Sequence, residues 1–184
     1  MPGCVFKHFP TQQQMTTPEN KEAAAVAIIE SLAPSRSFLI LRRARHPEDP
    51  WSGHFSFPGG RKESCDRDLF ATCLRETTEE TGIVLTRQQL IKDLTPEPAG
   101  RDSSTLLWVK PYFFSIPQRP PLHLDRQEIA NGHWLKVEEF NNHTLHKKVE
   151  LIPGRSFWAF PFHNYYIWGF TYRLLCKILK PCKK

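Results

Sequence analysis

The chain has 184 residues, of which 40% are apolar and 24% charged, and its formal net charge is +6. This composition predicts one soluble globular domain and excludes an intrinsically disordered chain. The longest apolar runs, such as residues 23–29, are too short to cross a bilayer, so no membrane association is expected.

The apolar pattern of the first half predicts strands and one long helix. Residues 23–29 and 37–41 indicate buried strands, and residues 55–57 indicate a short strand that leads into a Pro-Gly-Gly turn. Residues 66–81 form the strongest predicted helix. A helical turn or a strand is expected at 87–94, and a turn-rich loop follows at 96–104.

The second half predicts more strands and a terminal helix. Residues 106–116 indicate a strand pair or one bent strand, in which Pro111 favours a sheet edge or a bulge. Residues 132–140 contain a strand and an acidic turn, and residues 165–179 have apolar residues at helical spacing. Strands and helices mix without strict alternation, which predicts an α+β or mixed α/β fold.

The ends of the chain differ from its centre in composition. We expect a flexible leader at 1–19, a single domain at 20–180 and a basic tail at 181–184. Five cysteines without a CxxC pair favour reduced thiols over a disulfide framework. No basic stretch leads into an apolar signal segment. A cytoplasmic location is therefore expected.

The predicted helix has an acidic end that helix stability does not explain. Leu69, Cys73, Glu76 and Glu80 share one stripe, so two acids continue an apolar face, and Glu79 lies beside them. Acids near a helix C-terminus oppose the helix dipole, and the pair four residues apart is self-repelling. A bound cation would remove both penalties, and oxygen ligands suit Mg2+ or Mn2+.

The helix and the turn before it resemble the Nudix box, whose pattern is G-x5-E-x7-R-E-U-x-E-E-x-G-U with U apolar. The matching positions are Gly60, Asp66, Arg75, Glu76, Glu79, Glu80 and Gly82. Asp66 stands where the pattern has glutamate, and eight residues rather than seven separate it from Arg75. Thr77 takes an apolar position. The REx2EExG core is intact.

The resemblance to the Nudix hydrolase superfamily implies an α/β/α sandwich built on a mixed β-sheet. It also implies metal-dependent hydrolysis of a nucleoside diphosphate linked to another group. Glu76 and Glu80 would ligate Mg2+ or Mn2+, and the carbonyl of Gly60 would complete the coordination. Glu79 would be a ligand or would hold the metal-bound water.

Two further roles belong to the expected chemistry. Arg75 can hold a carboxylate in place by a bidentate contact. The group that acts as base or positions the attacking water is left open among Glu79, Glu128 and, as the weakest candidate, Glu97.

The segment before the box resembles a coenzyme A pyrophosphatase-like subgroup, whose pattern is LLxxR-[SA]-x3-R-x3-G-x3-FPGG. The matching positions are Leu39, Arg43, Ala44, Gly53 and residues 57–60. The subgroup's second arginine is missing, because Glu48 and Asp49 occupy the candidate positions. Residues 167–171 also resemble the subgroup's terminal helix. Coenzyme A or another nucleoside diphosphate derivative remain the alternatives for the substrate.

Several side chains near this segment have two readings. Arg42, Arg43 and Arg45 are expected either to bind substrate phosphates or to be solvated charges at a strand end. His54 is expected to be structural or solvent-facing, like the other histidines. Trp51, Trp158, Phe113 and Tyr165 could stack a base, but packing is the favoured role for each.

Two other functions stay open at this point. One is a Nudix-like module that binds a nucleotide without cleaving it. The other is an RNA 5′-end pyrophosphohydrolase, which only the lysines near the C-terminus favour. A nucleoside diphosphate-type small molecule is the expected partner rather than nucleic acid, and a homodimer is left open.

Overall fold

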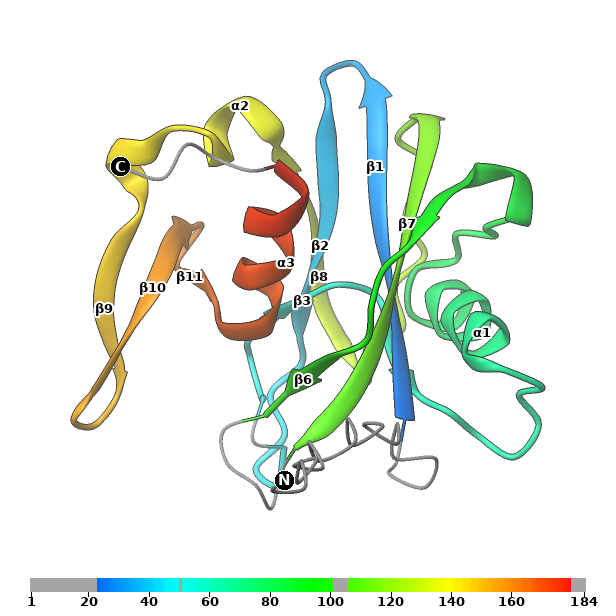
Figure 1. Ribbon diagram of the computed structural model, residues 1–184, viewed down its shortest axis with the longest axis horizontal. Coiled ribbons are helices and arrows are strands. Elements are labelled where there is room, and N and C mark those ends of the chain that lie inside the picture. The colour runs from blue at the N-terminus through cyan, green and yellow to red at the C-terminus, as the bar shows by residue number, and fades with distance from the viewer. Residues whose placement is uncertain (1–22, 50, 101–105, 180–184) are drawn as a thin grey trace, which may run out of the picture.

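A central mixed sheet organises the computed structural model, which describes residues 23–49, 51–100 and 106–179. The expected leader at 1–19 and tail at 181–184 lie outside the described residues. The strands of this sheet are β1 (Ala23–Ala33), β2 (Ser37–Arg43), β3 (Phe55–Ser56), β4 (Gly59–Arg61), β5 (Leu90–Asp93), β6 (Glu97–Ala99), β7 (Leu107–Gln118) and β8 (Ile129–Lys136). β1 pairs in parallel with β7 and antiparallel with β2 and β4, which makes the sheet mixed (Figure 1).

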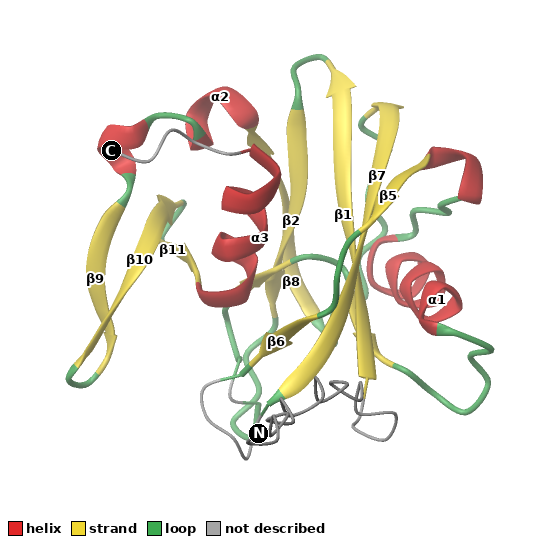
Figure 2. Cartoon of the chain, in the orientation of Figure 1, coloured by secondary structure: helices red, strands yellow, loops and turns green. Residues whose placement is uncertain are grey.

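Helices cover both faces of the central sheet (Figure 2). They are α1 (Leu69–Thr81), the short α2 (Val137–Phe140) and α3 (Gly169–Leu179), with 3-10 turns at Arg87–Gln89 and His143–Leu145. α1 lies on one side of the sheet and α3 on the other. This arrangement confirms the expected mixed α/β sandwich.

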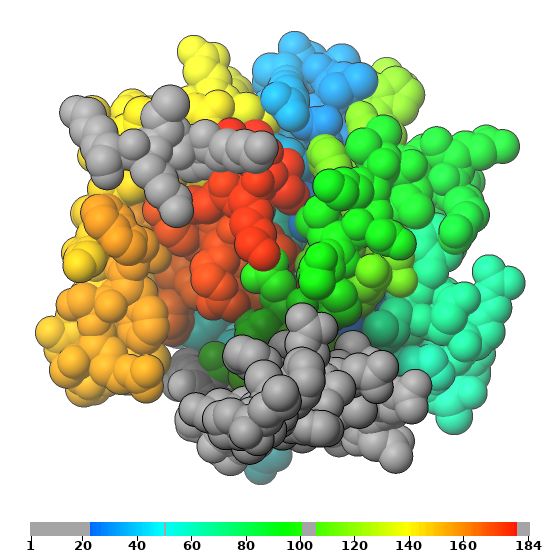
Figure 3. Space-filling model, viewed as in Figure 1, coloured from blue at the N-terminus to red at the C-terminus, as the bar shows by residue number. Residues whose placement is uncertain are grey.

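A second, antiparallel sheet completes the face that α3 covers. It consists of β9 (Lys147–Ile152), β10 (Arg155–Phe162) and β11 (Tyr165–Trp168). In Figure 3, the surface of α3 lies between the hairpin of β9 and β10 and the segment that contains β5 and β6. The C-terminal elements therefore form one continuous wall on this side of the molecule.

The alternation of side chains along β1 separates two hydrophobic cores. Ala25, Ala27 and Ile29 are fully buried on the face that packs against α1. Ile28 is fully buried on the opposite face, in the core that contains Leu174 of α3. Because neighbouring residues of a strand point to opposite faces, a strand covered on both sides needs a continuous apolar run.

The long helix begins later than the sequence predicted. α1 starts at Leu69 rather than at Asp66, and Asp68 is its N-cap, accepting a hydrogen bond from the Ala71 N–H at 2.8 Å. Asp66 instead bonds to Arg75 further along the helix. Gly82 ends the helix at φ 72°, as the sequence predicted.

Two other segments differ from the expectation in type. The Pro-Gly-Gly segment is not only a turn, because Gly59–Arg61 form β4 against β1. Tyr165–Trp168 form β11, so the terminal helix begins at Gly169. The aromatic run of β11 pairs with β10 from Ala159 to Phe162, which gives it strand partners that the local sequence does not reveal.

The strand β7 also corrects one expectation. It is a single strand that pairs with β1 on one side and with β5 and β6 on the other, so Pro111 is not at a sheet edge. Pro111 lies between the stretches of β7 that pair with β5 and β6, so its lack of an N–H interrupts neither pairing. The carbonyl of Pro111 accepts a hydrogen bond from the Leu94 N–H at 3.0 Å. The segment 87–94 holds both expected elements, a 3-10 turn and then β5. β6 interrupts the loop expected at 96–104.

Across the part of the chain that the structure describes, none of the helices has the length and apolar character needed to cross a membrane.

Candidate active site

Two glycines bring the backbone of β4 against β1 and α1. A Cβ on Gly59, whose φ is +143°, would lie 2.2 Å from the carbonyl oxygen of Ala25. A Cβ on Gly60 would lie 2.4 Å from Oε1 of Glu76. The first contact is with backbone, so only glycine fits at position 59, whereas a Cβ at position 60 would displace the carboxylate of Glu76. The Gly60 backbone and the Glu76 carboxylate are therefore direct neighbours.

The acidic end of α1 faces the protein interior. Glu80 is 3% exposed, and its Oε2 accepts a hydrogen bond from the Gly59 N–H at 2.9 Å. Burial raises the pKa of Glu80 to about 8, with the nearby charge of Glu76 adding to the effect. Burial also raises the pKa of Glu76. These two acids continue the apolar stripe of the helix, as the sequence predicted.

The two acids differ in their compensation by cations of the chain. Among the described residues, no lysine or arginine forms an ion pair with Glu80, whereas Glu76 has Arg75 at 3.1 Å. A buried carboxylate without a cation is costly. Two carboxylates beside the Gly60 backbone form an oxygen-only set of donors, which fits Mg2+ or Mn2+ rather than a softer metal.

Arg75 joins the acids of the box to one another. Its Nε and Nη2 donate to the two carboxylate oxygens of Asp66 at 3.0 and 2.9 Å, and its Nη1 donates to Glu79 at 2.8 Å. The bidentate contact to Arg75 holds the pKa of Asp66 well below its usual range. Asp66 also accepts the hydroxyl of Thr72 at 2.9 Å. The aspartate that replaces the glutamate of the pattern thus anchors the loop to α1.

Glu79 lies apart from the buried acids. Its side chain is 57% exposed and bonds to Arg75 at the surface. Over the residues that the structure covers, no three histidine, cysteine, aspartate or glutamate side chains converge as a complete set of metal ligands. The structure brings Glu76 and Glu80 to the Gly59–Gly60 backbone, and it does not bring Glu79 there.

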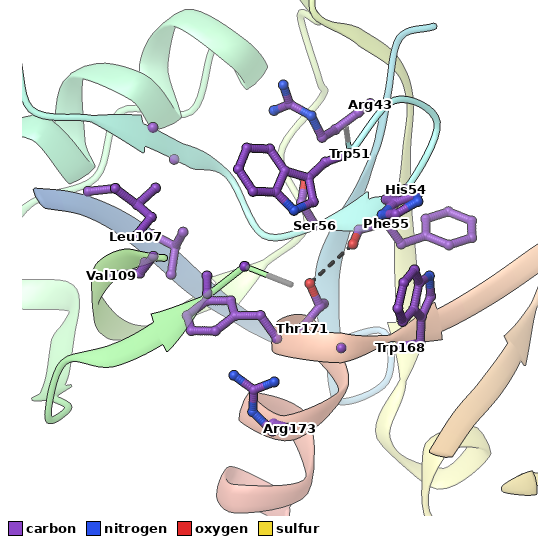
Figure 4. Close-up of a pocket in the computed structure, with 18 of the residues that line it drawn as sticks. Arg43, Trp51, His54, Phe55, Ser56, Leu107, Val109, Trp168, Thr171 and Arg173 are labelled. Carbon is purple, nitrogen blue, oxygen red and sulfur yellow. Dashed lines mark hydrogen bonds between the residues drawn. The ribbon is translucent and has the colours of Figure 1, made fainter. Parts of the chain in front are cut away.

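A cavity of about 530 Å³ opens beside this acidic end (Figure 4). Its polar wall includes Glu76, Glu128 and Arg43, and its aromatic wall includes Trp51 and Trp168. Thr171 at the start of α3 donates to the Phe55 carbonyl at 3.1 Å and ties α3 to β3 at the cavity wall. The volume lies within the range of small-molecule sites.

The two arginines of β2 have different surroundings. Arg43 lines the cavity, and its Nε and Nη2 donate to Asp49 at 3.0 and 2.9 Å. The guanidinium of Arg42 lies 4.7 Å from the ring centroids of both Phe55 and Tyr165, and burial lowers its pKa. Neighbouring residues of a strand point to opposite faces, so Arg43 faces the cavity and Arg42 packs among aromatic rings.

The two loop acids named as candidate bases are also separated. Glu128 lines the cavity together with Glu76, and the carbonyl of Glu128 accepts the Ala44 N–H at 2.7 Å. Glu97 forms an ion pair with Lys177 of α3. The structure therefore places Glu128, and not Glu97, beside the acidic end of α1.

Sequence reasoning missed part of the cavity lining. His54 lines the cavity and packs against the rings of Tyr165 and Trp168, a contact compatible with the structural role expected of it. Trp158 was considered for base stacking but is 53% exposed, whereas its neighbour Phe157 lines the cavity. Arg155 and Arg173 also line it. The register of β10 decides between Phe157 and Trp158, and the local sequence does not show which face of this strand is covered.

The fold and the acidic end of α1 beside the cavity fit a class of hydrolase, and comparison with known proteins identifies the family. A family model described as the NUDIX domain matches residues 21–153, so the chain belongs to the Nudix family. Nudix hydrolases cleave pyrophosphate bonds, and this is the enzyme class of the chain.

Relatives of similar sequence include bacterial and yeast proteins. The chain is 27% identical over 179 residues to an uncharacterized Nudix hydrolase, NudL, of Salmonella newport, which covers 92% of this chain and 91% of the relative. It is 30% identical over 122 residues to an uncharacterized protein of Schizosaccharomyces pombe. That alignment covers 64% of this chain and only 37% of the yeast protein, so the chain spans little more than a third of that relative's length.

Solved structures share the fold. A MutT/nudix family protein from Enterococcus faecalis has a TM-score of 0.63 at 18% identity, with 92% of this chain and 64% of that chain covered. The NUDIX domain of Shewanella oneidensis NrtR, complexed with ADP ribose, has a TM-score of 0.54 at 19% identity over 66% and 77% of the two chains. A C. elegans Ap4A hydrolase has a TM-score of 0.51 at 22% identity over 65% and 82%. At these identities the likeness concerns the fold alone.

Proposed function

We propose that the chain hydrolyses the pyrophosphate bond of a nucleoside diphosphate linked to another group, with Mg2+ or Mn2+ as cofactor. The observation that carries this proposal is the pair of partly buried Glu76 and buried Glu80, which lie against the Gly59–Gly60 backbone beside a cavity with aromatic walls. A helix selected for stability alone would not bury two acids near its C-terminus.

The proposed metal ligands are Glu76, Glu80, the carbonyl of Gly60 and Glu79. Glu79 joins the set by a change of side-chain rotamer, since it now bonds to Arg75. The bound cation would neutralise the phosphates and lower the pKa of a water molecule. The chain's own contribution is to hold the carboxylates ready, and the contacts of Arg75 to Asp66, Glu76 and Glu79 support this positioning role.

Glu128 is the proposed group that positions or deprotonates the attacking water, with Glu79 as the alternative. Its place on the cavity wall beside Glu76 supports this assignment. Arg43, on the same wall, is the proposed contact to a substrate phosphate, and Asp49 holds it in orientation. Arg42, enclosed by two aromatic rings, is assigned to packing rather than to the substrate.

Coenzyme A or a derivative is one candidate substrate, because the segment before the box resembles the coenzyme A-type pattern. ADP ribose and Ap4A, named with two proteins of similar fold, are nucleoside di- and polyphosphates of the same broad class. The buried acidic pair favours hydrolysis over binding without cleavage. The RNA 5′-end function depends on lysines near the C-terminus, of which the last three lie outside the described residues.

Residues 20–180 are proposed as one Nudix domain in a reducing, cytoplasmic environment. The mixed sheet, α1 and α3 share two adjoining cores within the described residues, which favours one unit. Cys65 and Cys73 are free thiols, as expected of a reducing compartment.

A substrate panel tests the proposed function. Purified protein is incubated with Mg2+ or Mn2+ and with coenzyme A, ADP-ribose, sugar nucleotides, dinucleoside polyphosphates and nucleoside triphosphates. We expect metal-dependent release of a nucleoside monophosphate or phosphorylated fragment from at least one of them. Tight nucleotide binding with no cleavage in either metal would favour the binding module instead.

A further inference from the structure

The loop between β2 and β3 lies against the loop before β8 that carries Glu128. The Ala44 N–H donates to the carbonyl of Glu128 at 2.7 Å. Nε2 of His46 lies 2.7 Å from the carbonyl oxygen of Gln127, which precedes Glu128 in the chain. Because a carbonyl oxygen only accepts, the ring of His46 carries a proton on Nε2 and donates this hydrogen bond. A side chain of one loop therefore holds the backbone of the other.

The two peptide groups on either side of the Glu128 side chain both have hydrogen-bond partners. The group before it has His46 at its carbonyl, and its N–H donates to the carbonyl of Asp125 at 3.2 Å. The group after it has the Ala44 N–H at its carbonyl, and its N–H donates to the same Asp125 carbonyl at 2.7 Å. Only the contact from His46 is made by a side chain, so a substitution can remove this contact and leave the others in place.

The loop between β2 and β3 is held in shape without the imidazole of His46. The His46 N–H donates to the hydroxyl oxygen of Ser52 at 2.9 Å, and its carbonyl accepts the Asp49 N–H at 3.2 Å. Asp49 also accepts two hydrogen bonds from the guanidinium of Arg43, at 3.0 and 2.9 Å. Replacing the ring therefore removes a support from the Glu128 loop, while Arg43 keeps its own partner at the cavity wall.

We propose that His46 is a positioning residue, which holds Glu128 at the cavity wall by fixing the peptide group before it. This inference rests on the proposed function, in which Glu128 positions or deprotonates the attacking water. His46 is exposed and does not line the cavity, whereas Glu128 does, so His46 acts through Glu128 and not on the substrate. A displacement of about 1 Å in a reacting group can lower a rate by about 100-fold, so even a small shift of this loop affects turnover.

Two substitutions at position 46 separate the hydrogen bond from the ring. His46→Phe keeps an aromatic ring without a donor, and His46→Gln keeps a side-chain N–H that reaches a similar place. With the best substrate of the panel, we expect kcat of His46→Phe to fall about tenfold and its KM to stay within about twofold, since Arg43 is not displaced. His46→Gln should keep kcat within about twofold of the wild type. Wild-type kcat in a folded His46→Phe would overturn the inference and leave the proposed hydrolysis intact.

A double-mutant cycle shows whether His46 acts through Glu128. In the background of Glu128→Gln, adding His46→Phe should lower kcat by less than about twofold, because the group that His46 positions is already disabled. An equal loss in both backgrounds would overturn the inference, since the effect would then belong to another part of the site. His143→Phe is the matched control, because His143 is also exposed but lies in the 3-10 turn after α2. It should keep the wild-type kcat, and the melting temperature of each variant shows whether it is folded.

A measurement without turnover keeps the inference separate from the proposed function. The Ala44 amide bonds to the Glu128 carbonyl, so its hydrogen exchange reports how firmly the two loops are joined. We expect this amide to exchange faster in His46→Phe than in the wild type, and at the wild-type rate in His143→Phe. Equal exchange in His46→Phe and the wild type would overturn the inference. A wild type that cleaves nothing on the panel would instead contradict the proposed function, and the catalytic role of His46 would fall with it.

Discussion

At the scale of single residues, the site depends on side-chain contacts between α1 and the loop that precedes it. Asp66 is the clearest case, because it departs from the family pattern and yet has a defined partner in Arg75. Asp66 therefore anchors the loop to α1 through Arg75, whose Nη1 lies 3.1 Å from Oε1 of Glu76.

The Asp66–Arg75 contact predicts a pH dependence of stability. The pKa of Asp66 is lower in the folded chain than in the unfolded one, so its contribution is present above the unfolded pKa of about 3.9. It is lost as the pH falls through that value toward the folded pKa. Urea unfolding should show Asp66→Asn less stable than the wild type at pH 7, with the gap narrowing at pH 3. A gap of equal size at both pH values would show that the charge of Asp66 is not responsible.

Residue positions also show what the sequence reveals of the site. The proximity of Gly60, Glu76 and Glu80 follows from the spacing of the box, and their role as metal ligands stays a prediction. Strand alternation predicts that Arg42 and Arg43, as neighbours in β2, point to opposite faces of the sheet. The local sequence does not show which face borders the cavity, because elements distant in the sequence cover each face. The exposed position of the Glu79 side chain reflects its hydrogen bond with Arg75, which the sequence pattern does not show.

At the scale of elements, the central strands are the easiest to predict because they are buried on both faces. The start of α1 is harder, because Asp66 and Asp68 are both suitable N-caps and only the contact to Arg75 removes the first of them. Tyr165–Trp168 suit a strand or a helix equally, since their aromatic side chains take their conformation from the neighbouring β10. Tertiary pairing decides such short segments.

β4 supplies an element-scale prediction. Gly59→Ala places a Cβ against the Ala25 carbonyl and requires a positive φ, so we expect a loss of at least about 2 kcal/mol in the free energy of unfolding. Gly154→Ala is the control, since it has φ +73° but no atom within 4 Å of the added Cβ. It should cost about 1 kcal/mol. Equal losses in urea unfolding would show that the contact between β4 and β1 is not tight.

At the scale of the whole molecule, the site lies where separate layers meet. α1 contributes the acids, β4 the glycines, and the C-terminal sheet with α3 much of the aromatic wall. The family model matches residues 21–153, which contain α1 and β4, whereas Trp168 and Thr171 of the cavity wall lie beyond that range.

Cation binding should stabilise the whole fold if the acids are ligands. We expect the melting temperature of the wild type to rise by several degrees as Mg2+ reaches about 100 times its dissociation constant. Glu76→Gln should reduce the rise, and a chelator should reverse it. An identical rise in both proteins would assign the effect to ions bound elsewhere.

The central claim is that the buried acids of α1 serve hydrolysis rather than folding, and turnover by Glu80→Gln tests it most directly. The variant is assayed in Mg2+ with the best substrate of the panel, alongside its melting temperature in a chelator. The account predicts a loss of kcat of about 1000-fold or more, because a bound cation supplies several kcal/mol of charge stabilisation. The melting temperature should be equal or higher, since burial raises the pKa of Glu80 and glutamine avoids the cost of protonating or ionising this group in the interior. Full activity in a folded Glu80→Gln would contradict the account.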